Sequence, residues 1–280
     1  MNSNAISQNF MADISIVGSG IKFPEHLTLE TIAVLEQCKS VYTIASHLSN
    51  EENTPPSLKS KIKNLWHLYQ PDRLRKENYR AMTEAILNAA HQESPIAYLA
   101  GGNPVVFDSV TQWIIESAKE HNLTVKVFPS ISSIDTIMVD LKYEVAPGLQ
   151  IYDASMLIGL NIEPRVYISC ILLQISTFGT SFTTAYRIPK KDFLAPLKTY
   201  LLRFYPLNHQ VYLVSSAFSN KQTSKIVNIS LEDIDDLNFE QIQGASLFIP
   251  PVYRPQKNID FFNKTMDINN FTNNYLLDSQ

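Results

Sequence analysis

Two tyrosines and an arginine stand at spacings that suit chemistry in the segment "YQPDRLRKENYRAM", residues 69–82. Tyr69 precedes Arg75 by six residues, and Tyr79 follows Arg75 by four. Residues four apart share one face of a helix, so Arg75 and Tyr79 lie side by side if this segment is helical, whereas Tyr69 must fold back from the preceding loop. A phenol becomes a usable base only when a neighbouring cation lowers its pKa. The opposing interpretation is a packed tyrosine and a solvated arginine on an ordinary helix.

The elements around this segment follow a regular alternation of short apolar runs and amphipathic runs. "DISIVGSG" (13–20) predicts a strand that ends in glycines, and "LTLETIAVLEQCKS" predicts a helix with Thr28 as its N-cap. The pattern predicts further strands at residues 40–45, 62–69, 96–100 and 123–130 and further helices at 73–91, 105–122 and 132–141. Such alternation is typical of a parallel α/β sheet, in which ligands bind beyond the carboxyl ends of the strands.

The second half of the chain is richer in β-type runs. These runs cover residues 152–161, 165–176, 181–188, 210–217, 224–230 and 245–251, with one predicted helix at 190–205. We therefore predict a disordered leader (1–11), an N-terminal parallel α/β domain (12–147), a C-terminal β-rich α/β domain (148–253) and a polar, asparagine-rich tail (254–280) that packs weakly or needs a partner.

Composition excludes several classes of protein. The 280 residues are 45% hydrophobic and 18% charged, with a formal net charge of -4, which argues against nucleic acid or an anionic membrane as a partner. We find no apolar run of the roughly 18 residues that a membrane span requires, and the first ten residues lack the features of a signal peptide. The two widely separated cysteines indicate reduced thiols and a cytoplasmic location, and the six histidines show no metal-ligand spacing.

Glycine-containing turns follow two of the predicted strands. "VGSG" resembles part of a dinucleotide fingerprint, but Phe23 stands where its third glycine belongs. In "AGGNP", two consecutive glycines allow a ligand to approach the main chain and leave amide N–H groups free to bind it. A plain tight turn is the alternative interpretation of "AGGNP".

Several of these segments, taken in order, resemble the motifs of the tetrapyrrole methylase superfamily. "IVGSGIKFPEHLTLETIAVLEQCKSVYT" is similar to its V-G-x-G-P-G-D-P-x-x-L-T-L opening, "AGGNPVVF" to its G-G-D-P-x-V-F loop, and "VFPSISSIDTIMVDL" to its V-x-P-G-I-S-S segment. "ASLFIPP" resembles the strand that closes the second domain, so the matches run from about residue 13 to 253. The resemblance implies two α/β domains with an S-adenosylmethionine cleft between them, and a homodimer.

Within that superfamily the chain is most like the borosin peptide backbone α-N-methyltransferases. "VDLKYEVAPGLQIYDASML" is similar to their A-D-L-G-I-D-P-x-x-x-G-x-Q-x-x-E-A-S segment, and "ILLQISTFG" to L-L-W-Q-x-x-x-x-G. Their catalytic tyrosine, arginine and second tyrosine are matched by Tyr69, Arg75 and Tyr79. The chain departs from the superfamily at residues 21–23, where "IKF" replaces P-G-D, and from the borosin pattern at Gly101, where a tyrosine is common.

Amide chemistry suggests a role for each matched residue. Our hypothesis is that Tyr69 takes part in removing the amide proton, that Arg75 and Tyr79 hold the amide oxygen, and that Trp66 lines the same substrate pocket. The sequence leaves open which of the two tyrosines is the base. The residues that the resemblance implies to bind the cofactor are Ile21, Gly101, Gly102, Asn103, Val106, Ser132, Ser133, Gln174 and Ala217. Simple helix capping is the alternative role for the two serines.

The resemblance also bears on the substrate. Fused borosin enzymes end in a long clasp and an apolar core peptide that they methylate on themselves, whereas this chain ends in the polar "FFNKTMDINNFTNNYLLDSQ". We therefore expect a split system that methylates a precursor peptide supplied in trans. One alternative is a methyltransferase of the same fold that acts on a tetrapyrrole or another small molecule. Another is a non-catalytic binding protein that retains the fold.

Overall fold

The first sheet is entirely parallel. The computed structural model describes residues 12–45, 54–184 and 187–274, so the predicted leader lies outside the described part. The strands of this sheet are β1 (Ile14–Gly18), β2 (Ser40–Thr43), β3 (Ile62–Asn64), β4 (Ile96–Ala100) and β5 (Val125–Val127). They are arranged in the order β3-β2-β4-β1-β5, and every neighbouring pair is parallel. The carboxyl ends of β1, β4 and β5 therefore lie at one edge of the sheet.

Helices cover both faces of this sheet, which explains why its central strands read as nearly continuous apolar runs. Helices α3 (Arg75–Glu93) and α4 (Ser109–Ala118) pack on one face, where they bury Ile14 and Ile16 of β1. Helices α1 (Leu29–Gln37) and α2 (Pro56–Lys59) pack on the other face, against Val17. The period of two along β1 thus sends alternate side chains into two separate cores.

The second sheet is mixed. Its strands are β6 (Leu149–Asp153), β7 (Ser169–Leu173), β8 (Gln210–Ser215), β9 (Lys225–Ser230) and β10 (Ser246–Ile249). They are arranged in the order β6-β7-β10-β8-β9, in which only β6 and β7 run parallel. One face packs against α6 (Ala154–Gly159), α7 (Ala195–Leu201) and the 3-10 helix η5 (Leu231–Asp236). The short α8 (Phe239–Ile242) precedes β10.

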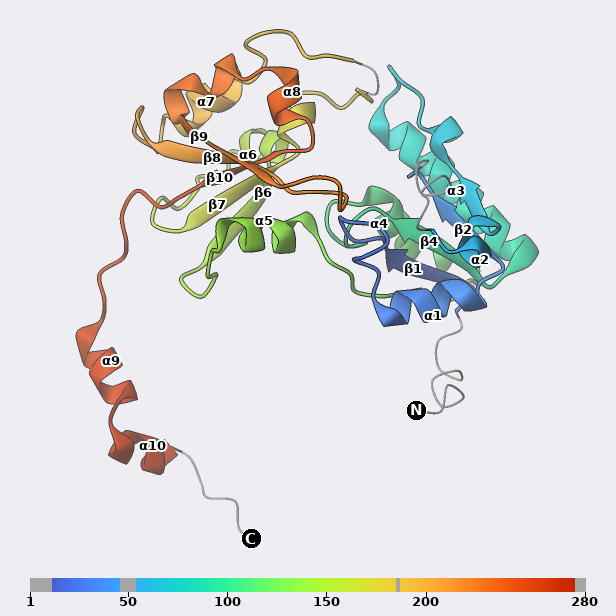
Figure 1. Ribbon diagram of the computed structural model, residues 1–280, viewed down its shortest axis with the longest axis horizontal. Coiled ribbons are helices and arrows are strands. Elements are labelled where there is room, and N and C mark those ends of the chain that lie inside the picture. The colour runs from blue at the N-terminus through green and yellow to red at the C-terminus, as the bar shows by residue number, and fades with distance from the viewer. Residues whose placement is uncertain (1–11, 46–53, 185–186, 275–280) are drawn as a thin grey trace.

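Helix α5 (Ser133–Leu141) connects the two halves. It follows β5 in the sequence, but its Ile137 packs with Ile171, Val214 and Phe248 of the second sheet. In Figure 1 it lies beneath that sheet. The domain division at residue 148 stays a prediction. Helix α5 precedes this division in the sequence but packs with strands that follow it.

Two predicted elements were wrong in ways that matter for the site. Residues 152–161 are not a strand: β6 ends at Asp153, whose side chain accepts hydrogen bonds from the amides of Ser155 and Met156 and so begins α6. The helix predicted from residue 105 begins only at Ser109, where Asp108 caps it. The loop before Asp108 is therefore free to line a site.

Two further predicted strands are shorter than expected or missing. Residues 62–69 form the three-residue strand β3 followed by the 3-10 helix η3 (Trp66–Leu68). In 181–188 the described residues form no strand; Phe182 instead makes an isolated bridge with Leu74. Both of these irregular stretches lie beside the segment that carries Tyr69, Arg75 and Tyr79, because η3 precedes Tyr69 and Phe182 pairs with Leu74.

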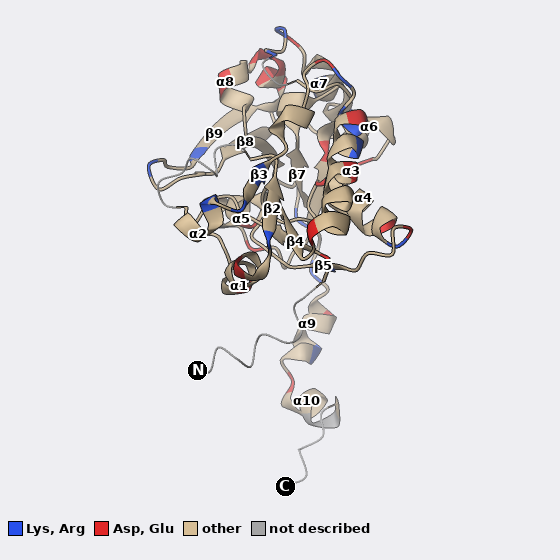
Figure 2. Cartoon of the chain, turned by 90° about the vertical axis from the view of Figure 1, so that its right-hand side faces the viewer, with Lys and Arg blue, Asp and Glu red and all other residues tan. Residues whose placement is uncertain are grey.

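The tail beyond residue 253 forms two short helices, α9 (Ile259–Thr265) and α10 (Ile268–Asn274), that extend away from the body of the molecule (Figures 1 and 2). Figure 2 also shows basic and acidic positions interspersed over both halves. Among the described residues, no helix combines the length and apolar character needed to cross a membrane.

Candidate active site

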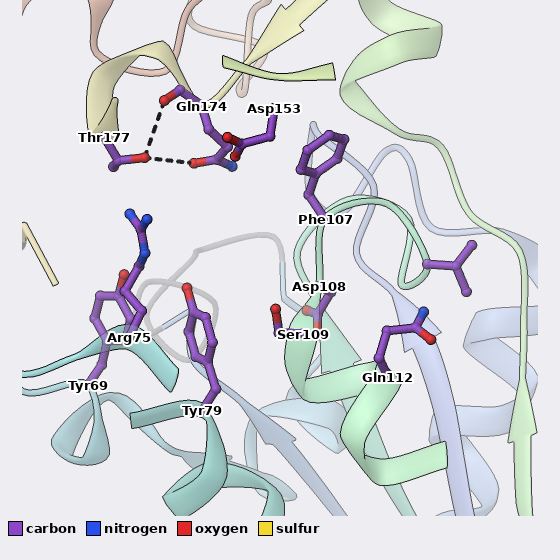
Figure 3. A pocket seen from close by; sticks show the side chains of 11 residues that line it. Tyr69, Arg75, Tyr79, Phe107, Asp108, Ser109, Gln112, Asp153, Gln174 and Thr177 are labelled. Atoms are coloured by element: carbon purple, nitrogen blue, oxygen red, sulfur yellow. Dashed lines mark hydrogen bonds between the residues drawn. The ribbon is translucent and has the colours of Figure 1, made fainter. Parts of the chain in front are cut away.

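The loop before α3 and the first two turns of that helix bring Tyr69, Arg75 and Tyr79 together (Figure 3). Tyr69 lies directly after η3 and folds back, so that its ring stacks on that of Tyr79 with 6.1 Å between ring centroids and 17° between ring planes. Arg75 is the first residue of α3 and lies one turn before Tyr79. The three side chains extend into the same hollow.

We call this hollow, of about 310 Å³, the tyrosine hollow. Its other walls come from the loop before α4, from the start of α4 and from the second sheet. The lining residues besides the three above are Val105, Phe107, Asp108, Ser109, Gln112, Asp153, Gln174 and Thr177. Figure 3 shows Gln174 and Thr177 facing Arg75 across the hollow.

Burial is the main cause of two raised pKa values in this hollow, those of Tyr79 and Asp108. Burial raises the pKa of Tyr79 well above the ordinary value for a phenol, the neighbouring Tyr69 raises it further, and Arg75 only partly opposes this. Tyr79 therefore keeps its proton at neutral pH and is a hydrogen-bond donor. Burial also raises the pKa of Asp108, although its carboxylate accepts hydrogen bonds from the amide of Thr111 (2.7 Å) and the hydroxyl of Tyr98 (3.1 Å).

Trp66 lies next to Tyr69 but is not among the residues that line the tyrosine hollow. Its ring packs against that of Tyr69 at 5.2 Å between centroids, and it is absent from the described lining of the hollow. That Trp66 lines the substrate pocket stays a prediction, and the contact seen in the structure is with the ring of Tyr69. Trp113 supports the other tyrosine, with its ring edge-on to Tyr79 at 6.4 Å.

A second hollow, of about 270 Å³, lies beyond the carboxyl ends of β1, β4 and β5, and we call it the glycine hollow. It brings together eight of the nine residues that the resemblance implies for the cofactor: Ile21, Gly101, Gly102, Asn103, Val106, Ser132, Ser133 and Gln174. The second sheet closes it with residues that the sequence did not single out, namely Leu173, Ser176, Gly244, Ala245 and Ser246. Four of these residues belong to the segments "ILLQISTFG" and "ASLFIPP", whose resemblance to the family assigned no site role to them.

Glycines allow the loops of this hollow to pack closely. A Cβ on Gly18 would lie 2.1 Å from the Gly102 carbonyl oxygen and 2.5 Å from the Ser130 Cβ. A Cβ on Gly101, in contrast, would meet nothing within 4 Å, so this glycine faces open space. The expectation of free amide groups fails at Gly102, because its N–H donates to the Gly20 carbonyl at 3.2 Å.

Ser132 caps a helix and also lines the glycine hollow. It is the N-cap of α5 and forms a capping box with Asp135, in which each side chain bonds the other residue's backbone N–H. It also lines the glycine hollow beside Ser133. Capping fixes the start of α5 next to the loop glycines.

Ala217 does not join the other eight residues. It lines two other hollows, one of them with Lys22, His26 and Asp140. The reason is that β8 ends beside the C-terminal part of α5, where Asp140 accepts a hydrogen bond from Ser216. A contact of Ala217 with the cofactor stays a prediction.

The two hollows meet at Phe107 and Gln174, which line both of them. Both residues have left-handed backbone conformations, with φ of 57° and 61°. A non-glycine residue in this region costs on the order of 1–3 kcal/mol and persists only when its surroundings hold it there. These two strained positions therefore mark the border across which a group could pass from one hollow to the other.

The glycine hollow fits S-adenosylmethionine on this chain's own features. Open space at Gly101 lets a ligand approach the main chain, and the serines beside it supply hydroxyls for an adenosine or amino-acid group. Its opening toward the tyrosine hollow at Phe107 and Gln174 suits a donor that must present one end to a second molecule.

Comparisons with known proteins agree with this architecture. The sequence profile of a family described as Tetrapyrrole (Corrin/Porphyrin) Methylases matches residues 13–234. A relative from Phlebiopsis gigantea, a methyltransferase and type II borosin cyclic peptide precursor named pgiMA1, is 26% identical over 261 residues, covering 91% of this chain and 46% of that protein. The chain spans about half the length of the curated relatives it matches.

Solved structures confirm the predicted α/β class with two sheets. The methyltransferase CobJ aligns with a TM-score of 0.61 at 12% identity, covering 88% of this chain and 96% of that one. Uroporphyrin-III C-methyltransferase from Thermus thermophilus, in complex with S-adenosylhomocysteine, aligns with a TM-score of 0.53 at 18% identity, covering 85% and 91%. At these identities the likeness concerns the fold alone.

Proposed function

This chain belongs to the Tetrapyrrole (Corrin/Porphyrin) Methylases family, and from that premise we propose that it uses S-adenosylmethionine to N-methylate backbone amides of a separate precursor peptide. One observation carries the proposal: the cluster of Tyr69, Arg75 and Tyr79 lines a hollow that adjoins the glycine hollow at two shared residues. The printed descriptions of relatives as borosin peptide precursors support a peptide as the substrate.

The glycine hollow would hold the cofactor, through the loops at Gly101 and Ser132 and the segment at Gln174. S-adenosylmethionine supplies an electrophilic methyl group when it is bound. The contribution of these residues is to fix the donor facing the tyrosine hollow, and such alignment supplies much of the rate of a transfer reaction.

The acceptor must be activated, because the lone pair of an amide nitrogen is delocalised into its carbonyl. In our proposal Tyr69 takes part in removing the N–H proton, while Arg75 and the protonated Tyr79 donate hydrogen bonds to the amide oxygen as it gains negative charge. The activated nitrogen would then accept the methyl group that the donor in the glycine hollow would supply, with the donor's sulfur as the leaving group. The N–H proton leaves by way of Tyr69 to solvent.

Three properties complete the proposal. We propose that the enzyme works as a homodimer, that it is cytoplasmic, and that its two α/β domains divide near residue 148. Sedimentation of the purified chain and fractionation of its cells test the first two, and expression of residues 12–147 alone tests the third.

The direct test is to incubate the purified chain with deuterium-labelled S-adenosylmethionine and the short peptide encoded nearest to its gene, and to fragment the products by mass spectrometry. We expect labelled methyl groups on backbone nitrogens of the peptide. Labelled methyl groups on the chain's own tail would contradict a separate substrate.

Two further results would contradict the proposal more deeply. Methylation of a tetrapyrrole in the same assay, with none on the peptide, would indicate a small-molecule enzyme of the same fold. Absence of S-adenosylmethionine binding by calorimetry would indicate a binding protein without catalytic activity.

A further inference from the structure

A segment from the second half of the chain crosses to the start of α3. This segment, residues 179–184, follows η4 (Ile175–Thr177), and we call it the strap. It bridges to α3 through the isolated pair Leu74 and Phe182 and through the amide of Thr183, which donates to the Arg73 carbonyl at 2.8 Å. The strap thus forms a short stretch of irregular pairing with the residues just before Arg75.

The strap supplies hydrogen-bond acceptors for the N-terminus of α3, which has no capping side chain of its own. The N-cap residue Leu74 has no side chain able to accept a hydrogen bond, and the first amides of any helix need partners. The amide of Arg75 donates to the Ser181 carbonyl at 2.9 Å, and the Arg75 guanidinium donates to the Thr180 carbonyl at 2.5 Å. Both the backbone and the side chain of Arg75 are therefore held by the second half of the molecule.

Asn78 ties the strap to the loop that carries Tyr69. Its side chain is fully buried, and its Nδ2 donates to the Gln70 carbonyl and to the Thr183 hydroxyl oxygen, each at 2.8 Å. Gln70 is the direct neighbour of Tyr69, so one amide group fixes the backbone beside this tyrosine to the strap. Leaving a buried N–H donor without an acceptor costs free energy, so movement of the strap away from Asn78 is unfavourable.

We infer that Asn78 and Thr183 are positioning residues, which hold Tyr69 and Arg75 at a fixed separation by joining the loop, α3 and the strap. The inference rests on the proposed function, because it assigns these residues to the methyl-transfer step. Asn78 lies on the buried side of α3, between Arg75 and Tyr79 in the sequence, and acts through the backbone of its neighbours. A displacement of about 1 Å of such groups can cost about a hundredfold in rate.

A stability role alone would give a different result from a positioning role. In the first case, weakening the link lowers the melting temperature and leaves the rate of folded molecules unchanged. In the second case, kcat falls while the KM for S-adenosylmethionine stays the same, because the glycine hollow does not include the strap.

The test uses Thr183→Val, which keeps the shape of a buried side chain and removes the acceptor for Asn78. The matched control is Thr31→Val, since Thr31 in α1 is equally buried and its hydroxyl also takes part in a side-chain hydrogen bond. We expect Thr183→Val to lower kcat by about ten- to a hundredfold at a temperature where both variants are folded. Thr183→Ser should restore most of the rate, and Thr31→Val should match the wild type.

Equal kcat values in Thr183→Val and Thr31→Val would overturn the inference. An absence of transfer by the wild type would instead overturn the proposed function, and hydrogen exchange then decides the inference separately. Exchange of the amides in residues 69–79 should be faster in Thr183→Val than in Thr31→Val. Identical exchange in the two variants would show that the link positions nothing.

Discussion

The glycine hollow and the tyrosine hollow adjoin each other but are built in different ways. The glycine hollow is formed by loops at strand ends, with small residues such as Gly101 and Ser132, and its shape follows from close backbone packing. The tyrosine hollow is formed by large ionisable side chains, of which Tyr79 is buried enough to have a raised pKa. In our proposal the glycine hollow holds the methyl donor, and the tyrosine hollow removes a proton from the acceptor amide.

This difference predicts that substitutions will affect the rate of methyl transfer and the affinity for the cofactor separately. Changes in the tyrosine hollow should lower the rate of transfer and leave cofactor affinity intact. Changes in the glycine hollow should lower cofactor affinity, often together with stability, because the same backbone contacts that shape the hollow also hold the first sheet.

The largest effect is expected from Tyr79→Phe. Loss of a donor to a developing oxyanion typically lowers kcat by about 10²–10³-fold. Single-turnover transfer should fall by this amount, while calorimetry should give unchanged cofactor affinity. Tyr205→Phe is the matched control, because its buried hydroxyl has no hydrogen-bond partner among the described residues. A Tyr79→Phe enzyme with normal turnover would remove this hydroxyl from the mechanism.

The next largest effect is expected from Gly18→Ala. The new methyl group would lie 2.1 Å from the Gly102 carbonyl oxygen, so the backbone must shift, at a cost of about 1–3 kcal/mol in the free energy of unfolding. Denaturant unfolding and cofactor calorimetry should both show a loss. In Gly101→Ala, whose Cβ meets open space, only cofactor affinity should fall. Equal stability of the two variants would contradict the close packing.

A smaller effect is expected from Ser132→Ala. Removal of an N-cap costs about 1 kcal/mol, and the same change removes a hydroxyl from the glycine hollow. Thr28→Ala removes the N-cap of α1, which lies outside both hollows, and should cost similar stability without loss of cofactor affinity. If both variants bind the cofactor equally well, Ser132 serves only as a cap.

The smallest effect is expected at Glu93, which belongs to neither hollow. Hydrogen bonds from Lys63 and then from Tyr42 lower the pKa of Glu93 from 4.5 to about 2. This contribution to stability is present above pH 4.5 and is lost as the pH falls toward about 2. Glu93→Gln should flatten that part of the unfolding profile and leave turnover and cofactor affinity unchanged. An unaltered acid profile would contradict the lowered pKa.

Local sequence patterns were sufficient for much of the fold. The amphipathic run that predicted a helix at 73–91 forms α3, and the glycines after two apolar runs do end β1 and β4. The helix start at residue 105 was wrong because the apolar run "VVF" continues the helical pattern, whereas Phe107 has a left-handed backbone. Asp108 carried the correct signal as a favourable N-cap residue.

By itself the sequence determined the spacing of Tyr69, Arg75 and Tyr79 and the small residues of the glycine hollow, because local periodicity and turn chemistry are written in neighbouring residues. The tertiary structure alone decided that Tyr69 folds back onto Tyr79, that Ala217 lies elsewhere, and that the strap holds Arg75. Asn78 and Thr183 are 105 residues apart. No local pattern specifies such a contact, since it depends on how the second sheet places the strap against α3.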